Sequence, residues 1–206
     1  MRRRLPFIAL ALVLLAELPI LIPPPFGLTD HLLFWFAGHL AATGGSPYDA
    51  AAWAEAQRTY ESGHLLRFIA QGDPVWVYPA WSVLVFIPFG LLPYPLGPLV
   101  LHVAYIATGI LAVILFVRLL PERWQPRAEL AIPLAAVFQP LVIASRYGQF
   151  GSFLLLGVVL VFYGLRDRRT TPFAAGALLL FTKPQLFLVL VPVTLALLVR
   201  ARAWRP

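Results

Sequence analysis

Residues 98–120 read PLVLHVAYIATGILAVILFVRLL, an apolar run that contains a single charged side chain, Arg118. A helix needs roughly 20 apolar residues to cross about 30 Å of hydrocarbon, so Pro98–Leu120 predicts a membrane-spanning helix. Leu5–Pro25 is a second long apolar run and follows three arginines. It exceeds the roughly 7–15 apolar residues of a cleaved signal peptide, and no small-residue cleavage site follows it. We therefore expect an uncleaved anchor with a cytoplasmic N-terminus.

The composition of the whole chain agrees with this prediction. Of its 206 residues, 60% are hydrophobic and only 12% are charged, and the mean hydropathy is +0.81. Soluble domains carry about 25% charged residues, and disordered chains are poor in apolar residues, so both classes are excluded. The chain has no cysteine, which excludes disulfides and thiolate metal sites. The predicted fold class is an all-α integral membrane protein.

Several shorter apolar segments follow, of lengths typical of helices packed inside a bundle or of broken helices that meet at a buried site. Trp81–Leu92 contains Pro88 and Gly90 and is shorter than a membrane-spanning helix needs to be. We expect six or seven transmembrane or partly spanning helices in a single domain, residues 1–206. The shorter segments are Glu129–Ala144, Phe150–Leu165, Pro172–Thr182 and Gln185–Val199.

The distribution of charge predicts the orientation. Lys and Arg number 16 against nine acids, a net charge of +7. The arginines form short runs between apolar segments, which favours cytoplasmic loops over a nucleic-acid partner. Residues 29–77 contain five of the nine acids, so we expect an extracytoplasmic loop there. Within it Asp30–Ala42 and Asp49–Ser62 read as helices, the first apolar enough to lie at the membrane interface.

The same orientation gathers the polar candidates on one side. If the arginine runs lie inside, Trp81–Leu92 must enter and leave on the outer face. Asp30, Arg146, Gln149 and Lys183 then reach that outer face together.

Two acids of the loop are candidates for chemistry. Asp30 follows the first apolar run, and its carboxylate could deprotonate a hydroxyl group or cap the following helix; one residue could do both. Asp49 most simply caps the second helix, with acceptor binding as the alternative. Glu17, inside the first apolar run, is a protonated core acid or a proton relay.

The candidate cations are Lys183 and Arg146. Lys183 is the only lysine of the chain and interrupts an apolar stretch, so it either holds an anion such as a lipid phosphate or extends to the interface. Arg146 either binds phosphate or anchors a helix end, and Gln149 could hydrogen-bond a sugar. His31 and His39 are eight residues apart, too far for an i, i+4 metal pair, and His102 has no ligand-like neighbour in the sequence. We predict no metal and no cofactor.

Five short motifs occur in a characteristic order. They are Asp30, Ala37-Gly38 leading to Gly44-Gly45-Ser46-Pro47-Tyr48-Asp49, Tyr78-Pro79, Gly148-Gln149 and Lys183-Pro184-Gln185. In this order they resemble glycosyltransferase family 87, the polyprenol-phosphate-mannose-dependent membrane mannosyltransferases of the GT-C superfamily.

The resemblance implies a sugar transfer on the extracytoplasmic face of the plasma membrane. The donor would be mannose on a polyprenyl phosphate, and the acceptor a glycolipid or glycan. Asp30 would be the general base, while Lys183 and Arg146 would hold the donor phosphate. Contacts to the sugar or the acceptor would come from Gln149, Gln185, Asp49 and Tyr78.

The resemblance also implies a chain of about twice this length, so we expect residues 1–206 to be the N-terminal half, completed by a C-terminal half or a partner subunit. Two other classes of function remain open. One is a non-catalytic membrane subunit or scaffold that binds the polyprenyl-phosphate carrier. The other is a small transporter built around Lys183 and Glu17.

Overall fold

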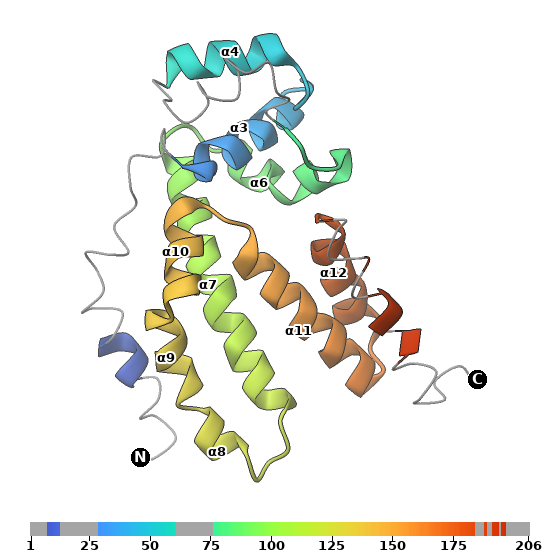
Figure 1. Ribbon diagram of the computed structural model, residues 1–206. Helices are drawn as coiled ribbons and strands as arrows, with labels where there is room; N and C mark the ends of the chain where they lie inside the picture. Colours follow the sequence, from blue (N-terminus) through green and yellow to red (C-terminus); the bar gives the residue numbers. More distant parts are fainter. Residues whose placement is uncertain are drawn as a thin grey trace.

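The structure is a computed structural model that describes residues 8–12, 29–60, 76–183, 188, 191–193 and 195–196. Every regular element in this part of the chain is a helix, as the sequence predicts (Figure 1). Their order is α3 (Asp30–Ala42), α4 (Ala50–Thr59), the 3₁₀ helix η3 (Ala80–Val85), α6 (Ile87–Gly90), α7 (Leu96–Leu119), α8 (Gln125–Ala128), α9 (Ala131–Val137), α10 (Gln139–Tyr147), α11 (Gly151–Asp167) and α12 (Thr170–Phe181).

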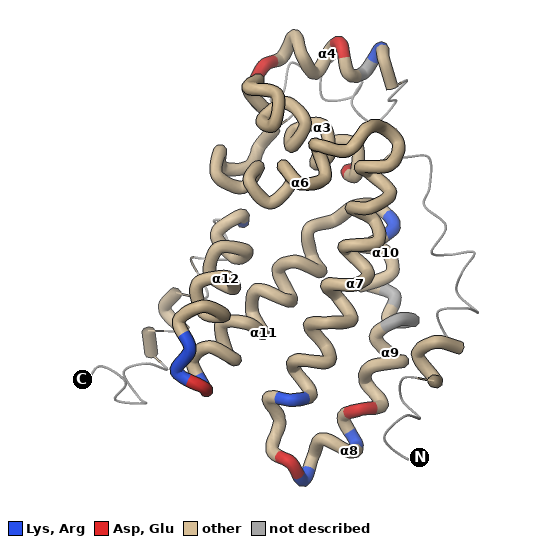
Figure 2. Tube along the Cα trace, turned by 180° about the vertical axis from the view of Figure 1, so that it is seen from behind, with Lys and Arg blue, Asp and Glu red and all other residues tan. Residues whose placement is uncertain are grey.

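The long helices alternate in direction below a cap made by α3, α4 and α6 (Figure 1). Helix α7 runs away from the cap, α9 and α10 return to it, α11 runs away again and α12 returns. Charged residues of α7 and α11 lie only at the ends of these helices that are farthest from the cap (Figure 2). The charged residues of these two helices therefore lie at one end of the bundle, opposite the cap.

Helix α7, Leu96–Leu119, confirms the helix predicted at 98–120. Among the described residues it is the one continuous helix long and apolar enough to cross a membrane. Residues Gln125–Ala135 and Pro140–Tyr147, in helices α8 to α10, form two segments bent by 41° that together are long and apolar enough for a second span. The expected total of six or seven stays a prediction, since Leu5–Pro25 and Gln185–Val199 lie largely outside the described residues.

Helix α3 has the predicted bounds. All residues from His31 to Gly38 are buried, so protein encloses this part of the helix, and its place at the membrane interface stays a prediction. Close backbone approach explains this enclosure. A Cβ on Gly38 would lie 2.3 Å from the Phe86 carbonyl oxygen, and one on Gly97 would lie 2.2 Å from the Trp35 ring.

The segment 81–92 does not form a spanning helix. It folds as η3 and α6, and a Cβ on Gly90 would lie 2.2 Å from the backbone of Gly38 in α3. The Nδ1 atom of His39 lies 3.0 Å from the Gly90 carbonyl oxygen, and the Trp35 indole donates to the Leu92 carbonyl at 3.0 Å. The segment thus enters and leaves at the cap, in agreement with the arrangement preferred from the sequence.

Helix α4 confirms the predicted capping role of Asp49. The Asp49 carboxylate accepts hydrogen bonds from the backbone N–H groups of Ala51 at 2.9 Å and Ala52 at 3.3 Å. These donors have no partner within the first turn of a helix, so the carboxylate of Asp49 is held by its own helix. This helix lies on the outside of the cap (Figure 1).

Candidate functional site

The site is built around a contact between two residues far apart in the sequence. Helix α3 begins at Asp30, and the Gln149 side-chain amide donates a hydrogen bond of 2.5 Å to Asp30 Oδ2. Thr29, not Asp30, is the N-cap residue, so the alternative of Asp30 as the cap is wrong. The start of α3 and the end of α10 therefore meet with the Asp30 carboxylate between them.

Gly148 allows this meeting. It ends α10 in the left-handed conformation with φ 75°, and its N–H and that of Gln149 return to carbonyls of the last turn. A Cβ on Gly148 would lie 2.6 Å from the His31 backbone nitrogen and 3.0 Å from the Asp30 carbonyl carbon. Glycine is needed here both for its backbone angle and for its lack of a side chain.

A chain of buried polar groups connects α3 to α7 and α10. Thr29 Oγ1 lies 2.9 Å from His31 Nδ1, His31 Nε2 lies 3.2 Å from His102 Nδ1, and His102 Nδ1 lies 3.1 Å from the Ser145 carbonyl oxygen. His31, His102 and Ser145 are all buried. The chain joins α3, α7 and α10, the helices that place Asp30 and Gln149.

His31 is held in its neutral form. Burial, together with the neighbouring His102, lowers the pKa of His31 from 6.5 to about 3, although the Ser145 backbone partly opposes this. A neutral imidazole donates from one nitrogen and accepts at the other. His31 therefore helps to position α3 without adding a positive charge of its own beside Asp30.

An aromatic cluster supports the other side of α3. The Phe34 ring stacks on Phe86 at 4.5 Å and contacts Tyr78 at 5.4 Å. The Tyr48 hydroxyl donates to the Tyr78 carbonyl at 2.7 Å. Burial and the charge of Asp30 raise the pKa of Tyr78, which places this candidate within electrostatic reach of the carboxylate.

The two candidate cations lie at helix ends that face the cap. Arg146 is in the last turn of α10 and is exposed. Lys183 follows α12 and is partly buried, and its N–H returns to the Leu180 carbonyl at 3.2 Å. The Trp81 indole donates to the Phe181 carbonyl at 3.3 Å, so the end of α12 is attached to η3, which packs against α3 and α6 of the cap.

The structure thus separates the sequence candidates. Asp30 and Gln149 touch, Tyr78 lies near them, and Arg146 and Lys183 are at the same end of the bundle. Asp49 is occupied in capping α4, and Gln185 lies outside the described residues.

Sequence reasoning missed the interior of the site. His102 does have a partner, His31, and Tyr105 packs edge-on against the His31 ring at 5.6 Å. The buried hydroxyls of Tyr105 and Ser152 have no hydrogen-bond partner within the described part of the chain. Polar residues inside otherwise apolar helices were the available signal.

The comparisons with known proteins identify the family of the chain. The family model of glycosyltransferase family 87 matches residues 76–206, which include Arg146, Gln149 and Lys183. No curated protein and no solved structure matches the chain. Since the match covers well over half of the sequence, the chain belongs to glycosyltransferase family 87, a family of membrane glycosyltransferases.

Proposed function

We propose that this protein transfers mannose from a polyprenyl-phosphate donor to a glycolipid or glycan acceptor on the extracytoplasmic face of the plasma membrane. The observation that carries the proposal is the hydrogen bond from Gln149 to Asp30. It gives a carboxylate a fixed orientation at the cap, where helix ends also bring two cations. The proposal includes a multi-pass, GT-C-like arrangement with a cytoplasmic N-terminus.

In this mechanism Asp30 is the general base. Its carboxylate takes the proton of the acceptor hydroxyl, the acceptor oxygen bonds to the anomeric carbon, and the bond from that carbon to the phosphate oxygen breaks. The donor sugar is inverted and polyprenyl phosphate leaves. Because Gln149 occupies Oδ2, it orients the carboxylate for proton transfer.

Arg146 and Lys183 are proposed to stabilise the departing phosphate. Negative charge grows on the leaving oxygen in the transition state, and preorganised cations lower the energy of such a charge. Arginine offers planar paired donors and lysine a mobile point charge. Tyr78, Gln149 and Gln185 are proposed to contact the sugar or the acceptor. Asp49 is proposed for the same role, although its carboxylate already accepts a hydrogen bond from the start of α4.

A second candidate function is carrier binding without catalysis. It is favoured by one observation: the family match begins at residue 76 and so includes both cations but not Asp30. A membrane subunit that holds a polyprenyl phosphate needs these cations and does not need a base.

The test is sugar transfer by the purified protein in lipid, from polyprenyl-phosphate-mannose to a panel of glycolipid acceptors. We expect Asp30→Asn to lower the transfer rate by ~10²–10⁴-fold, the usual contribution of a general base, with donor binding unchanged. Glu55→Gln is the matched control, since it neutralises another carboxylate of the same loop, one that is exposed on α4 and pairs with Arg58, and it should keep most of the activity.

Each other outcome has a definite meaning. Full activity in Asp30→Asn contradicts the assignment of the base. Donor binding without transfer in the unmodified protein favours the carrier-binding function.

A further inference from the structure

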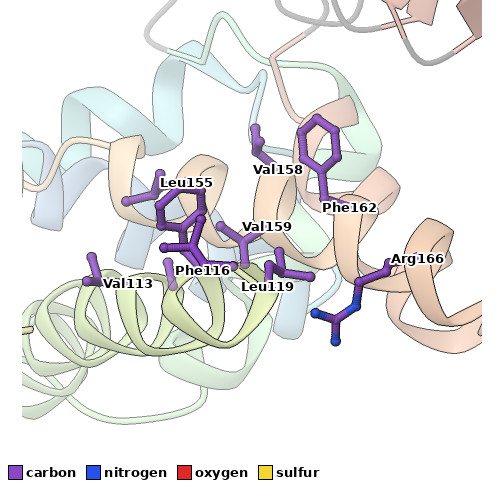
Figure 3. A pocket seen from close by; sticks show the side chains of 10 residues that line it. Val113, Phe116, Leu119, Leu155, Val158, Val159, Phe162 and Arg166 are labelled. Carbon is purple, nitrogen blue, oxygen red and sulfur yellow. The ribbon is translucent and has the colours of Figure 1, made fainter. Parts of the chain in front are cut away.

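A groove of about 540 Å³ lies between the second half of α7 and most of the length of α11 (Figure 3). Its lining residues run from Ala112 to Leu120 on α7 and from Leu155 to Arg166 on α11. All of them are apolar except Arg166, which lies at one end. The groove is therefore shaped for a ligand that is apolar along its length and anionic at one end.

The apolar walls are open to the surroundings of the protein. Phe116 is 51% exposed, Phe162 43% and Leu155 41%. An exposed apolar surface of this kind in a helical pair marks a contact with lipid or with another apolar partner. In a bilayer an acyl chain fits this surface without any polar contact along its length.

Arg166 supplies the polar end. Its Nε and Nη2 donate to the Asp167 carboxylate at 2.8 and 3.4 Å, and its Nη1 donates to the Arg118 carbonyl at 2.9 Å. A guanidinium has five N–H donors, so these bonds fix it at the mouth of the groove and leave two donors for a ligand. Arg168 and Arg169 follow in the sequence and make this end of the bundle basic.

Charge complementarity selects the occupant. Among the described residues, Arg166 is the one charged residue that lines the groove, and residues 166–169 contain three arginines against one aspartate. The net charge at this end of the groove is therefore positive, which favours an anion. A phospholipid offers both the apolar chain and the phosphate.

We propose that this groove binds one anionic phospholipid, with an acyl chain between α7 and α11 and its phosphate on Arg166. The lipid comes from the membrane leaflet at the arginine end of the bundle, the end that holds Arg118, Arg127 and Arg166. The site rests on the membrane placement included in the proposed function but not on Asp30 or on sugar transfer. Its polar end is separate from the proposed donor site, because Arg166 is in the last turn of α11 and Asp30 and Gln149 meet beside the start of that helix.

The test is native mass spectrometry of the purified full chain in detergent, titrated with phosphatidylglycerol or with phosphatidylcholine. We expect one retained phosphatidylglycerol and no comparable retention of phosphatidylcholine. Arg166→Gln should weaken this binding by about tenfold, the loss of a charge-assisted contact. Val158→Trp should block the groove, and the helix content from circular dichroism checks its fold.

Arg123→Gln is the matched control, because it removes an arginine from the same end of the bundle at a position that does not line the groove. Equal losses in Arg123→Gln and Arg166→Gln would show general attraction to basic residues and overturn the proposal. Three other results would also overturn the proposal. They are unchanged phosphatidylglycerol binding in Arg166→Gln and in a folded Val158→Trp, equal retention of phosphatidylglycerol and phosphatidylcholine, and no retention of either lipid. Displacement by polyprenyl phosphate would assign the groove to the donor. A protein that retains phosphatidylglycerol but transfers no sugar contradicts only the proposed function.

Discussion

Gly148 is the residue on which the contact between Asp30 and Gln149 depends. We expect Gly148→Ala to lower the unfolding temperature and the transfer rate, because a methyl group would strike the His31 backbone at 2.6 Å in addition to the cost of φ 75°. Gly44→Ala is the control, since Gly44 has φ 81° but no atom within 4 Å of its Cβ position. Its cost should be the backbone term alone, about 1 kcal/mol.

The measurement is thermal unfolding of both variants in detergent, together with sugar transfer. Equal decreases in unfolding temperature for Gly148→Ala and Gly44→Ala would show that the close contact between Gly148 and α3 does not contribute to stability. A larger shift for Gly148 with unchanged transfer would separate the stability of this junction from the proposed chemistry.

His31 predicts a pH dependence of stability. Its pKa is about 3 in the folded protein and 6.5 as the reference value, so the unfolded chain binds a proton between these values that the folded chain does not. Stability is complete above pH 6.5 and falls as the pH decreases, by up to ~1.4 kcal/mol per pH unit. Thermal unfolding from pH 7.5 to 4.5 should show this loss, and His31→Asn should make the curve flatter. An identical slope in the variant would contradict a neutral, buried His31.

At the scale of residues, the sequence predicted the outer parts of the site better than its interior. The alternation of basic runs and apolar segments was enough to place Asp30 and Gln149 on one side. The His31–His102 contact was missed because it joins positions 71 residues apart, and helical periodicity carries no information on such pairs. Asp49 was predicted because capping depends on neighbouring residues alone.

At the scale of elements, the pair α11–α12 determines where Lys183 lies. A Cβ on Gly176 would lie 2.5 Å from the Gly157 carbonyl oxygen and 2.7 Å from the Val161 nitrogen. These neighbours are backbone atoms and cannot turn away, so Gly176→Ala should push α12 off α11. Small residues allow such close packing between membrane helices. We expect a lower unfolding temperature and weaker use of the donor, because the Trp81–Phe181 contact moves with α12.

Gly151→Ala is the control for this prediction. It makes the same substitution near the start of α11, where the nearest neighbour is the Ala144 Cβ at an ordinary 3.7 Å. Alanine favours helices over glycine by about 1 kcal/mol, so stability should stay or rise. A loss in Gly151→Ala as large as that in Gly176→Ala would contradict a specific role for the α11–α12 contact.

The elements also show what hydrophobicity can and cannot predict. The bounds of α3 followed from its composition, but an all-apolar helix can be covered by lipid or by protein, and only the close approach of α6 and α7 decides this. The segment predicted at 129–144 is broken at Phe138, which has ψ 107° and precedes Gln139 and Pro140. Pro140 was the signal for this break, since proline favours the first turn of a new helix.

At the scale of the whole molecule, two kinds of chemistry lie at opposite ends of one bundle. The proposed base and both cations are at the cap, and the arginines of α7, α8 and α11 are at the other end (Figure 2). This separation follows from α7, α10, α11 and α12 alternating in direction while Trp81–Leu92 returns to the cap. The same argument could be made from the sequence, because it depends on the order of charges along the chain and not on side-chain contacts.

The orientation can be measured directly because the chain has no cysteine of its own. Ser46, Glu122 and Thr170 are exposed and can each be replaced by a single cysteine. Ser46 is in the cap, and the other two positions are at the end of the bundle that holds the arginines of α7, α8 and α11. With a membrane-impermeant thiol reagent, we expect Ser46→Cys to react in intact cells, and Glu122→Cys and Thr170→Cys to react only after permeabilisation. If Trp81–Leu92 crossed the membrane, the Ser46 and Glu122 positions would lie on the same side and react alike. The reverse pattern would place Asp30 in the cytoplasm, where the proposed lipid-linked donor is not presented to it.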